Sequence, residues 1–190
     1  FNNELNKNFL KNFKIRKPNY NLNIQNISSI DAISEVMTKT KKVLLKEKPD
    51  VFLIYGDTNS TYSALVAKSL KIPVFHMEAG NRCYSDKSPE EINRRIIDHS
   101  SNILLPYTKG SRMNLLKEGI SSKKIITTGN PIKEVIHFNI KKINNSKIIH
   151  KLNLKKYKFI VLTLHREENA DNIKKLGKFI NIFNTIVNTF

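Results

Sequence analysis

Short apolar runs recur along this chain at intervals that leave room for one helix between neighbouring runs. Residues 51–55 (VFLIY) form an uninterrupted apolar run, which is typical of a parallel strand covered on both faces. Further strands are predicted at residues 73–78, 103–107, 124–128 and 158–165. Strands that alternate with helices indicate right-handed βαβ units and an open parallel sheet. We therefore predict an α/β fold.

The segments between these runs have the apolar spacing and the end signals of helices. A helix is predicted over residues 31–48, followed by Pro49. A second begins at Ser88, where Pro89 suits the first helical position and Glu91 would complete a capping box.

A basic, polar stretch at residues 141–157 is predicted to be a linker. Residues 1–140 would then form one domain, and residues 158–190 would begin another. The chain opens without Met and ends within an amphipathic pattern, so we expect a fragment of a longer protein.

Composition excludes several classes of protein. The single cysteine, Cys83, rules out an intrachain disulfide, and no apolar run approaches the ~20 residues that span a bilayer. The net charge of +17 invites a nucleic-acid interpretation. However, 27 of the 33 basic residues are Lys and only 6 are Arg, whereas Arg is preferred for bidentate phosphate and base contacts. A solvated Lys-rich surface is therefore favoured, and a nucleic-acid-binding protein remains the non-enzyme alternative.

Polar residues cluster where the predicted strands end. Asp57 follows the strand at residues 51–55, and Glu78 ends the next one. Ligands of open parallel sheets bind at the carboxyl ends of the strands. Asp57 could instead cap the following helix. Glu78 is harder to explain structurally, because a partly buried carboxylate needs a partner or a raised pKa.

Two further groups could contribute to the same crevice. Glu90 and Arg94 are four residues apart on the predicted helix and can share a face, although this pair could equally be a surface ion pair. His165 and Arg166 lie at a strand end before a helix, a position that suits a diphosphate, and a plain polar loop is an equal alternative.

The motifs that contain these residues are more specific together than singly. They are GDTNST at 56–61, HMEAG at 76–80, PEEINR at 89–94, TGNP at 128–131 and LHREEN at 164–169. In this order the chain closely resembles the non-hydrolysing UDP-N-acetylglucosamine 2-epimerases of bacteria. The resemblance covers roughly residues 30 to 175. At residues 80–83 (GNRC) the chain departs from the commoner Gly-Leu-Arg and is more similar to the branch that acts on other 2-acetamido sugars, such as those leading to UDP-N-acetyl-L-fucosamine or a diacetamido uronic acid.

The resemblance implies a GT-B arrangement of two Rossmann-like, doubly wound parallel-sheet domains, with most of the first domain and the start of the second in this chain. It implies that Asp57, Glu78 and Glu90 are the catalytic carboxylates. It further implies that the substrate-binding residues include one histidine and three arginines, which are His165, Arg94, Arg82 and Arg166.

The family chemistry eliminates UDP across C1–C2 to give a glycal and then adds UDP back with a proton on the other face of C2. The resemblance implies a UDP-2-acetamido sugar substrate, no metal or redox cofactor, a homodimer, and a cytoplasmic enzyme of surface polysaccharide synthesis. A hydrolysing 2-epimerase and a GT-B glycosyltransferase remain alternatives.

Overall fold

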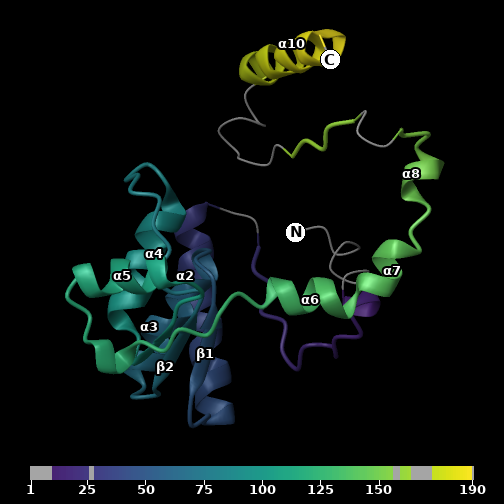
Figure 1. Ribbon diagram of the computed structural model, residues 1–190. Helices are drawn as coiled ribbons and strands as arrows, with labels where there is room; N and C mark the ends of the chain where they lie inside the picture. The colour runs from purple at the N-terminus through teal and green to yellow at the C-terminus, as the bar shows by residue number, and fades with distance from the viewer. Residues whose placement is uncertain (1–9, 26–27, 156–158, 164–172, 190) are drawn as a thin grey trace. The chain divides into compact units, whose positions relative to one another are not determined.

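The computed structural model describes residues 10–25, 28–155, 159–163 and 173–189 (Figure 1). The chain divides into two compact units, Phe1–Lys133 and Glu134–Phe190. The secondary structure of the first unit is α2 (Ser29–Glu47), β1 (Phe52–Tyr55), η1 (Asn59–Tyr62), α3 (Ser63–Ser69), β2 (Val74–Met77), α4 (Pro89–Ser100), β3 (Ile103–Leu105), α5 (Lys109–Lys117) and η2 (Ser122–Lys124). This alternation confirms the α/β prediction.

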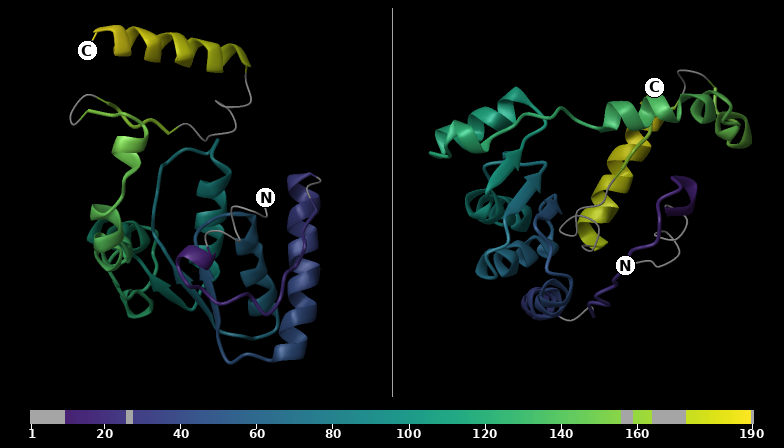
Figure 2. Two further views of the ribbon diagram at one scale, coloured as in Figure 1. Left: turned by 90° about the vertical axis from the view of Figure 1, so that its right-hand side faces the viewer. Right: turned by 90° about the horizontal axis from the view of Figure 1, so that it is seen from below.

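The three strands form one parallel sheet in the order β1-β2-β3. The register aligns Tyr55 with Met77 and Met77 with Leu105, so the strands end at one edge. The strand predicted at residues 124–128 reaches this sheet as a single parallel bridge between Leu104 and Ile125. The carboxyl ends of β1 and β2 therefore emerge next to each other, as the views in Figure 2 also show.

Helices cover one face of the sheet. Ile54 and Val74 pack with Leu44 of α2 and Ile97 of α4 in one buried cluster. A second cluster places Leu115 of α5 against Leu104 of β3. Both clusters lie on the face where Ile54, His76 and Leu104 are in register.

The other face of the sheet is exposed along β1 in the described part of the chain. Leu53 and Tyr55 alternate with Ile54 along β1, and they are 57% and 61% exposed. Our expectation that residues 51–55 are covered on both faces is therefore wrong for this structure. The physical reason is that the helices that pack on the sheet in the first unit come from one side, so only every second strand side chain is buried.

The ends of α2 follow the ordinary capping rules. The Ser28 hydroxyl accepts a hydrogen bond from the Asp31 N–H at 3.1 Å. At the other end Lys48 has φ 47°, and its N–H donates to the Leu44 carbonyl at 2.9 Å. The helix predicted over residues 31–48 is thus confirmed, with its start two residues earlier.

The second unit contains helices and little burial. Its helices are α6 (Ile132–Phe138), which crosses the boundary between the units, α7 (Ile140–Asn144), α8 (Ile148–Lys151) and α10 (Ile173–Thr189). The stretch predicted as a linker, residues 141–157, is thus partly helical. Residues 159–163, within the strand predicted at 158–165, have no strand partner among the described residues. A strand without a neighbour cannot complete its backbone hydrogen bonds, so that strand is not confirmed.

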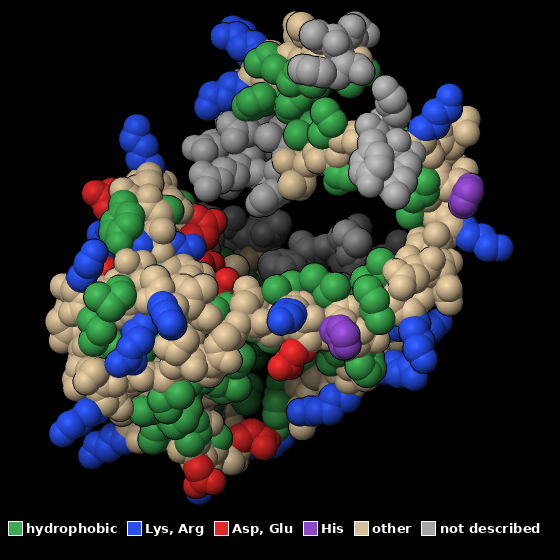
Figure 3. Space-filling view, viewed as in Figure 1, with side chains coloured by type: hydrophobic (Ala, Val, Ile, Leu, Met, Phe, Trp, Pro, Cys, Tyr) green, Lys and Arg blue, Asp and Glu red, His purple; other side chains and the backbone are tan. Residues whose placement is uncertain are grey.

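Two surface features bear on function. Over the described residues, no helix is both long and apolar enough to cross a membrane. On the face drawn in Figure 3, Lys and Arg side chains occur in several small groups and are not gathered into one patch.

Candidate active site

Two carboxylates emerge side by side from the carboxyl ends of β1 and β2. The Gly56 N–H donates to the Met77 carbonyl at 3.3 Å, which extends the ladder to the residue before Asp57. The Glu78 N–H donates to the Leu105 carbonyl at 3.2 Å. The Glu78 Oε2 atom lies 3.7 Å from the point that a Cβ atom on Gly56 would occupy. The Glu78 carboxylate therefore lies over the turn that carries Asp57.

The backbone at Glu78 is in the left-handed region, with φ 68°. A non-glycine residue is uncommon there and costs conformational energy. In this conformation the Glu78 carboxylate lies beside Gly56. Strain of this kind is found at functional sites, where the surrounding structure holds it.

The environment of Glu78 favours its protonated form. Partial burial raises the pKa of Glu78, and the neighbouring charge of Asp57 raises it further, while the positive charges of Arg94 and His76 oppose this. A carboxyl group that retains its proton closer to neutral pH is suited to general acid–base work.

Arg94 of α4 holds the second carboxylate. Its Nε and Nη2 atoms lie 2.8 Å and 2.6 Å from Asp57 Oδ2. Its Nη1 atom donates to Glu91 Oε2 at 2.9 Å. Arg94 and Asp57 are both largely buried, with side-chain exposures of 15% and 21%. The Asp57–Glu78–Arg94 group is therefore one connected site at the sheet edge.

Asn93 also positions the Asp57 turn, although the sequence analysis did not select it. Its side-chain amide donates to the Asp57 carbonyl at 2.9 Å and lies 3.4 Å from Asn59 Oδ1. Asn93 is buried. Its place inside the PEEINR motif, next to Arg94, is the signal that could have identified it.

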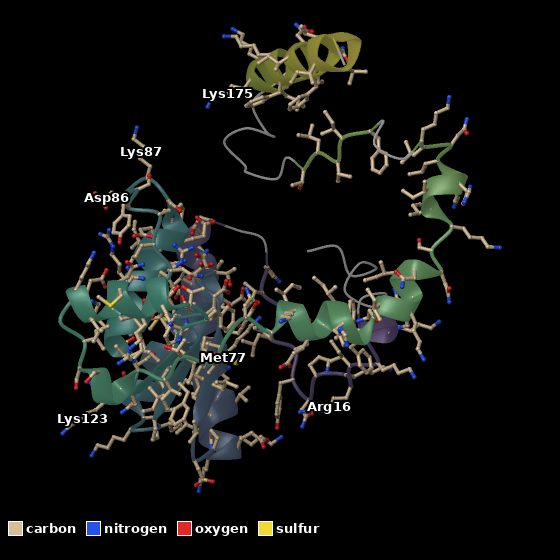
Figure 4. All side chains as sticks on the ribbon, in the orientation of Figure 1. Arg16, Met77, Asp86, Lys87, Lys123 and Lys175 are labelled. Atoms are coloured by element: carbon tan, nitrogen blue, oxygen red, sulfur yellow. The ribbon has the colours of Figure 1, made fainter. Side chains whose placement is uncertain are left out.

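Glu91 does not form the expected capping box. The Ser88 side chain makes no cap hydrogen bond, and the Glu91 carboxylate is buried, where it accepts from the Cys83 N–H at 2.9 Å and from Arg94. Burial opposes ionisation of Glu91, but the Cys83 N–H and the charge of Arg95 hold its pKa below the usual range. Glu91 thus ties the loop after β2 to α4. Asp86 and Lys87 lie at the tip of that loop, away from Met77 (Figure 4).

Glu90 is exposed, unlike its neighbour Glu91. Its carboxylate accepts a hydrogen bond from the Ser88 hydroxyl at 2.7 Å. It shares α4 with Arg94. Asp57 and Glu78 lie together at the sheet edge, and the role of Glu90 beside them stays a prediction.

Arg82, which is predicted to contact substrate, points inward in this structure. Its guanidinium donates to Glu118 through two nitrogens, both at 2.6 Å, and to Asp98 at 2.8 Å. The Arg82 side chain has no exposed surface. Two carboxylates thus bind the guanidinium of Arg82, and its contact with substrate stays a prediction. His165 and Arg166 lie outside the described residues.

Chemically, the site offers carboxylates and cations. Within residues 10–25, 28–155, 159–163 and 173–189, no group of three or more His, Cys, Asp or Glu side chains is placed to hold a metal ion.

Comparison with known proteins identifies the family. The family model described as UDP-N-acetylglucosamine 2-epimerase matches residues 1–189. The chain belongs to this family. The fold and the family predicted from the motifs are thereby confirmed.

Individual relatives agree with this 2-epimerase assignment. A UDP-N-acetylglucosamine 2-epimerase homolog of Methanococcus maripaludis is 44% identical over 183 residues, which are 95% of this chain and 51% of the relative. A UDP-2,3-diacetamido-2,3-dideoxy-D-glucuronate 2-epimerase of Pseudomonas aeruginosa is 35% identical over 94% of this chain and 50% of its own length.

Solved 2-epimerase structures extend the comparison to the fold. The enzyme of Methanocaldococcus jannaschii in complex with UDP-GlcNAc and UDP matches with a TM-score of 0.86 and 37% identity, over 96% of this chain and 51% of that one. The Rickettsia bellii enzyme matches with a TM-score of 0.87 and 41% identity, over 97% of this chain and 49% of that one. These are α/β epimerases of the GT-B type, and the chain shares their fold. It spans about half the length of the relatives it matches.

Proposed function

We propose that the full-length protein is a non-hydrolysing UDP-N-acetylglucosamine 2-epimerase, an isomerase that inverts C2 of a UDP-2-acetamido sugar. The observation that carries this proposal is the pair of carboxylates, Asp57 and Glu78, at the carboxyl edge of the sheet, with Arg94 beside them. The family membership of the chain gives this pair its reaction class.

The chemistry requires two proton transfers at one carbon. The C2 hydrogen of a 2-acetamido sugar is not next to a carbonyl, so simple deprotonation is unfavourable. Elimination of UDP across C1–C2 instead breaks the C2–H and C1–O bonds and leaves a glycal. UDP then adds back at C1 while a proton reaches the other face of C2. The atoms balance without any oxidant or reductant, so the reaction itself needs no redox cofactor.

We assign the acid–base work to Asp57 and Glu78. Glu78 is suited to carry the proton, because burial and the charge of Asp57 raise its pKa. Glu90 is proposed as a third acid because the family motif includes it. His165 and Arg166 are proposed to contact the departing diphosphate, and Arg94 to act within the site.

The remaining assignments rest on the same proposal. We propose that residues 1–140 belong to a first Rossmann-like domain, that residues 141–157 link it to a second, and that residues 158–190 begin the second. We further propose a cytoplasmic homodimer that supplies surface polysaccharide synthesis. The diacetamido relative makes a second substrate, a UDP-diacetamido uronic acid, a specific alternative.

The test is product analysis with the full-length protein. Incubation with UDP-N-acetylglucosamine in D₂O should give a UDP-linked epimer that carries deuterium at C2, detected by NMR. Release of UDP and free N-acetylmannosamine would support the hydrolysing alternative. A C2 without label would exclude the elimination route. The same assay with a UDP-diacetamido uronic acid decides between the two substrate classes.

Variants of the carboxylate pair should support the assignment. Asp57→Asn and Glu78→Gln should each lower kcat by roughly 10² to 10⁴ fold, the usual contribution of an acid–base group. Lys123→Gln, an exposed change in η2, is the matched control and should keep the wild-type rate. A near-normal rate in either carboxylate variant would remove that residue from the mechanism.

A further inference from the structure

Asp98 of α4 is a buried carboxylate that the proposed reaction does not use. It is 1% exposed. Its Oδ1 atom lies 2.8 Å from His76 Nδ1, and its Oδ2 atom accepts from the Gly80 N–H at 3.1 Å and from Arg82 at 2.8 Å. A buried carboxylate with this many donors is held in one position.

His76 of β2 continues this set of hydrogen bonds. Its side chain is fully buried, and its Nε2 atom lies 3.0 Å from the Gly56 carbonyl, while Nδ1 faces Asp98. Both partners are hydrogen-bond acceptors, so both bonds exist only if both ring nitrogens carry a hydrogen. A neutral imidazole carries one such hydrogen and an imidazolium carries two. The geometry therefore calls for a charged His76 paired with Asp98.

The charges in this buried network balance. Arg82 is paired with Glu118 through two nitrogens, so its charge has a carboxylate of its own. Asp98 is then available to balance the imidazolium of His76. Two cations and two carboxylates in contact are a stable arrangement for buried ionised groups, which need close partners and hydrogen bonds.

The network reaches both turns of the candidate active site. Gly56, whose carbonyl His76 holds, directly precedes Asp57, and Gly80, whose N–H Asp98 holds, lies two residues after Glu78. Both turns contain left-handed backbone, with φ 78° at Gly56 and 77° at Gly80. Asp98 also lies one helical turn after Arg94 on α4, so the same face of one helix fixes the cation and both turns.

We propose that Asp98 and His76 form a carboxylate–imidazolium pair that positions Asp57 and Glu78 relative to each other. Both are positioning residues, because neither is proposed to touch the sugar. Their effect on turnover rests on the proposed function, but the charged state of His76 does not.

The first experiment measures the charge on His76 and needs no substrate. NMR of the full-length protein with ¹⁵N-labelled histidine should show a doubly protonated ring that is assigned to His76 by its loss in His76→Gln. In Asp98→Asn the same ring should become neutral, because the amide that replaces the carboxylate has no charge to balance the imidazolium. A neutral His76 ring in the wild-type protein would overturn the proposal.

The second experiment measures turnover. Asp98→Asn and His76→Gln should lower kcat about 10- to 100-fold, since misplacement of a reacting group by about 1 Å can cost ~10²-fold, with KM little changed. Ser101→Ala is the matched control: it removes a buried hydrogen bond to the Ile97 carbonyl at the end of α4 but does not touch Asp98, His76 or the turns. It should lower Tm without this loss of kcat.

The pH dependence separates positioning from simple destabilisation. The charges that act on Glu78 are those of Asp57, Arg94 and His76, and Tyr107 lies near it. Loss of the positive charge at His76 should move the limb of the kcat/KM profile that belongs to Glu78 to higher pH in both variants, and not in Ser101→Ala.

The outcomes distinguish the two proposals. A wild-type protein with a charged His76 and no epimerase activity on any UDP-sugar would overturn the proposed function and leave the positioning pair intact. The positioning proposal would be overturned if the rate loss in both variants matched their loss of folded protein and the Glu78 limb of the kcat/KM profile did not move. If Asp98→Asn does not fold, His76→Gln alone decides, by the same rate and pH criteria.

Discussion

At the scale of single residues, Glu78 combines two unfavourable features. Its backbone is left-handed, at φ 68°, and its carboxylate is partly buried next to Asp57, which raises its pKa. Neither feature helps the fold. Residues of this kind reduce stability and are retained where activity requires them. Glu78 is therefore the residue at which activity and stability should oppose each other most clearly.

Glu78→Gln should raise stability while it removes activity. In wild type the folded state binds the Glu78 proton more tightly than the unfolded state does. The charged carboxylate therefore costs stability above the ordinary glutamate pKa of about 4.3, and this cost vanishes below it. Glu78→Gln lacks the cost, so its Tm should exceed that of wild type at neutral and alkaline pH.

The Tm difference should close in acid. Thermal unfolding of the full-length protein across this pH range is the measurement. Glu134→Gln in α6 removes the same charge from an exposed site and serves as control. A Glu78→Gln protein that is less stable than wild type at neutral pH would contradict the prediction.

At the scale of elements, the turn after β2 packs closely against α5, with no room for a side chain at Gly80. A Cβ atom on Gly80 would lie 2.3 Å from the Ser111 carbonyl oxygen and 2.8 Å from Leu115. Contacts this short with backbone require a helix to move. Asp98 fixes the same glycine through its N–H, so the position is determined from two sides.

Gly80→Ala should be strongly destabilising, and Gly119→Ala is its matched control. Both glycines have positive φ, 77° and 82°, but a Cβ atom on Gly119 would meet nothing within 4 Å. The control should show only the cost of left-handed backbone, about 1–2 kcal/mol. Gly80→Ala should lose at least about 1–3 kcal/mol more, the usual cost of overpacking. Equal free energies of unfolding in denaturant titrations would contradict this prediction.

The elements also show which parts of the structure can be predicted from the sequence. The strands β1, β2 and β3 and the pair Asp57 and Glu78 could be predicted, because apolar runs and the strand-end rule are local signals. The roles of Glu91 and Arg82 could not, because their partners depend on tertiary placement: Arg82 bonds Glu118, 36 residues away. The prediction that Leu53 is buried was wrong for the same reason. A run of apolar residues does not show whether helices pack on both faces of the sheet.

At the scale of the whole molecule, the charge of the chain is large but dispersed. A net charge of +17 makes the nucleic-acid alternative worth a direct test. The Arg residues of the described site are bound to carboxylates, as Arg82 and Arg94 show. The remaining positive charge is mainly that of Lys, and the face drawn in Figure 3 carries it in several small groups.

Binding to double-stranded DNA should therefore be weak and unspecific. Fluorescence anisotropy at physiological salt should give a Kd no tighter than about 1 μM, the range of non-specific binding, with a steep loss as salt rises. A scrambled duplex should bind equally well. Sequence-selective binding in the nanomolar range would favour the nucleic-acid alternative over the enzyme.

The open face of the sheet has a practical consequence for anyone who produces these 190 residues by themselves. β1 is an outer strand of the described sheet, and its apolar residues Leu53 and Tyr55 are exposed. The edge of such a strand can recruit a strand from another copy. We expect concentration-dependent light scattering from the isolated polypeptide. Leu53→Lys should suppress the scattering, because a lysine on an outer strand discourages pairing with another strand. Ile132→Lys adds the same charge on α6 and should not suppress it.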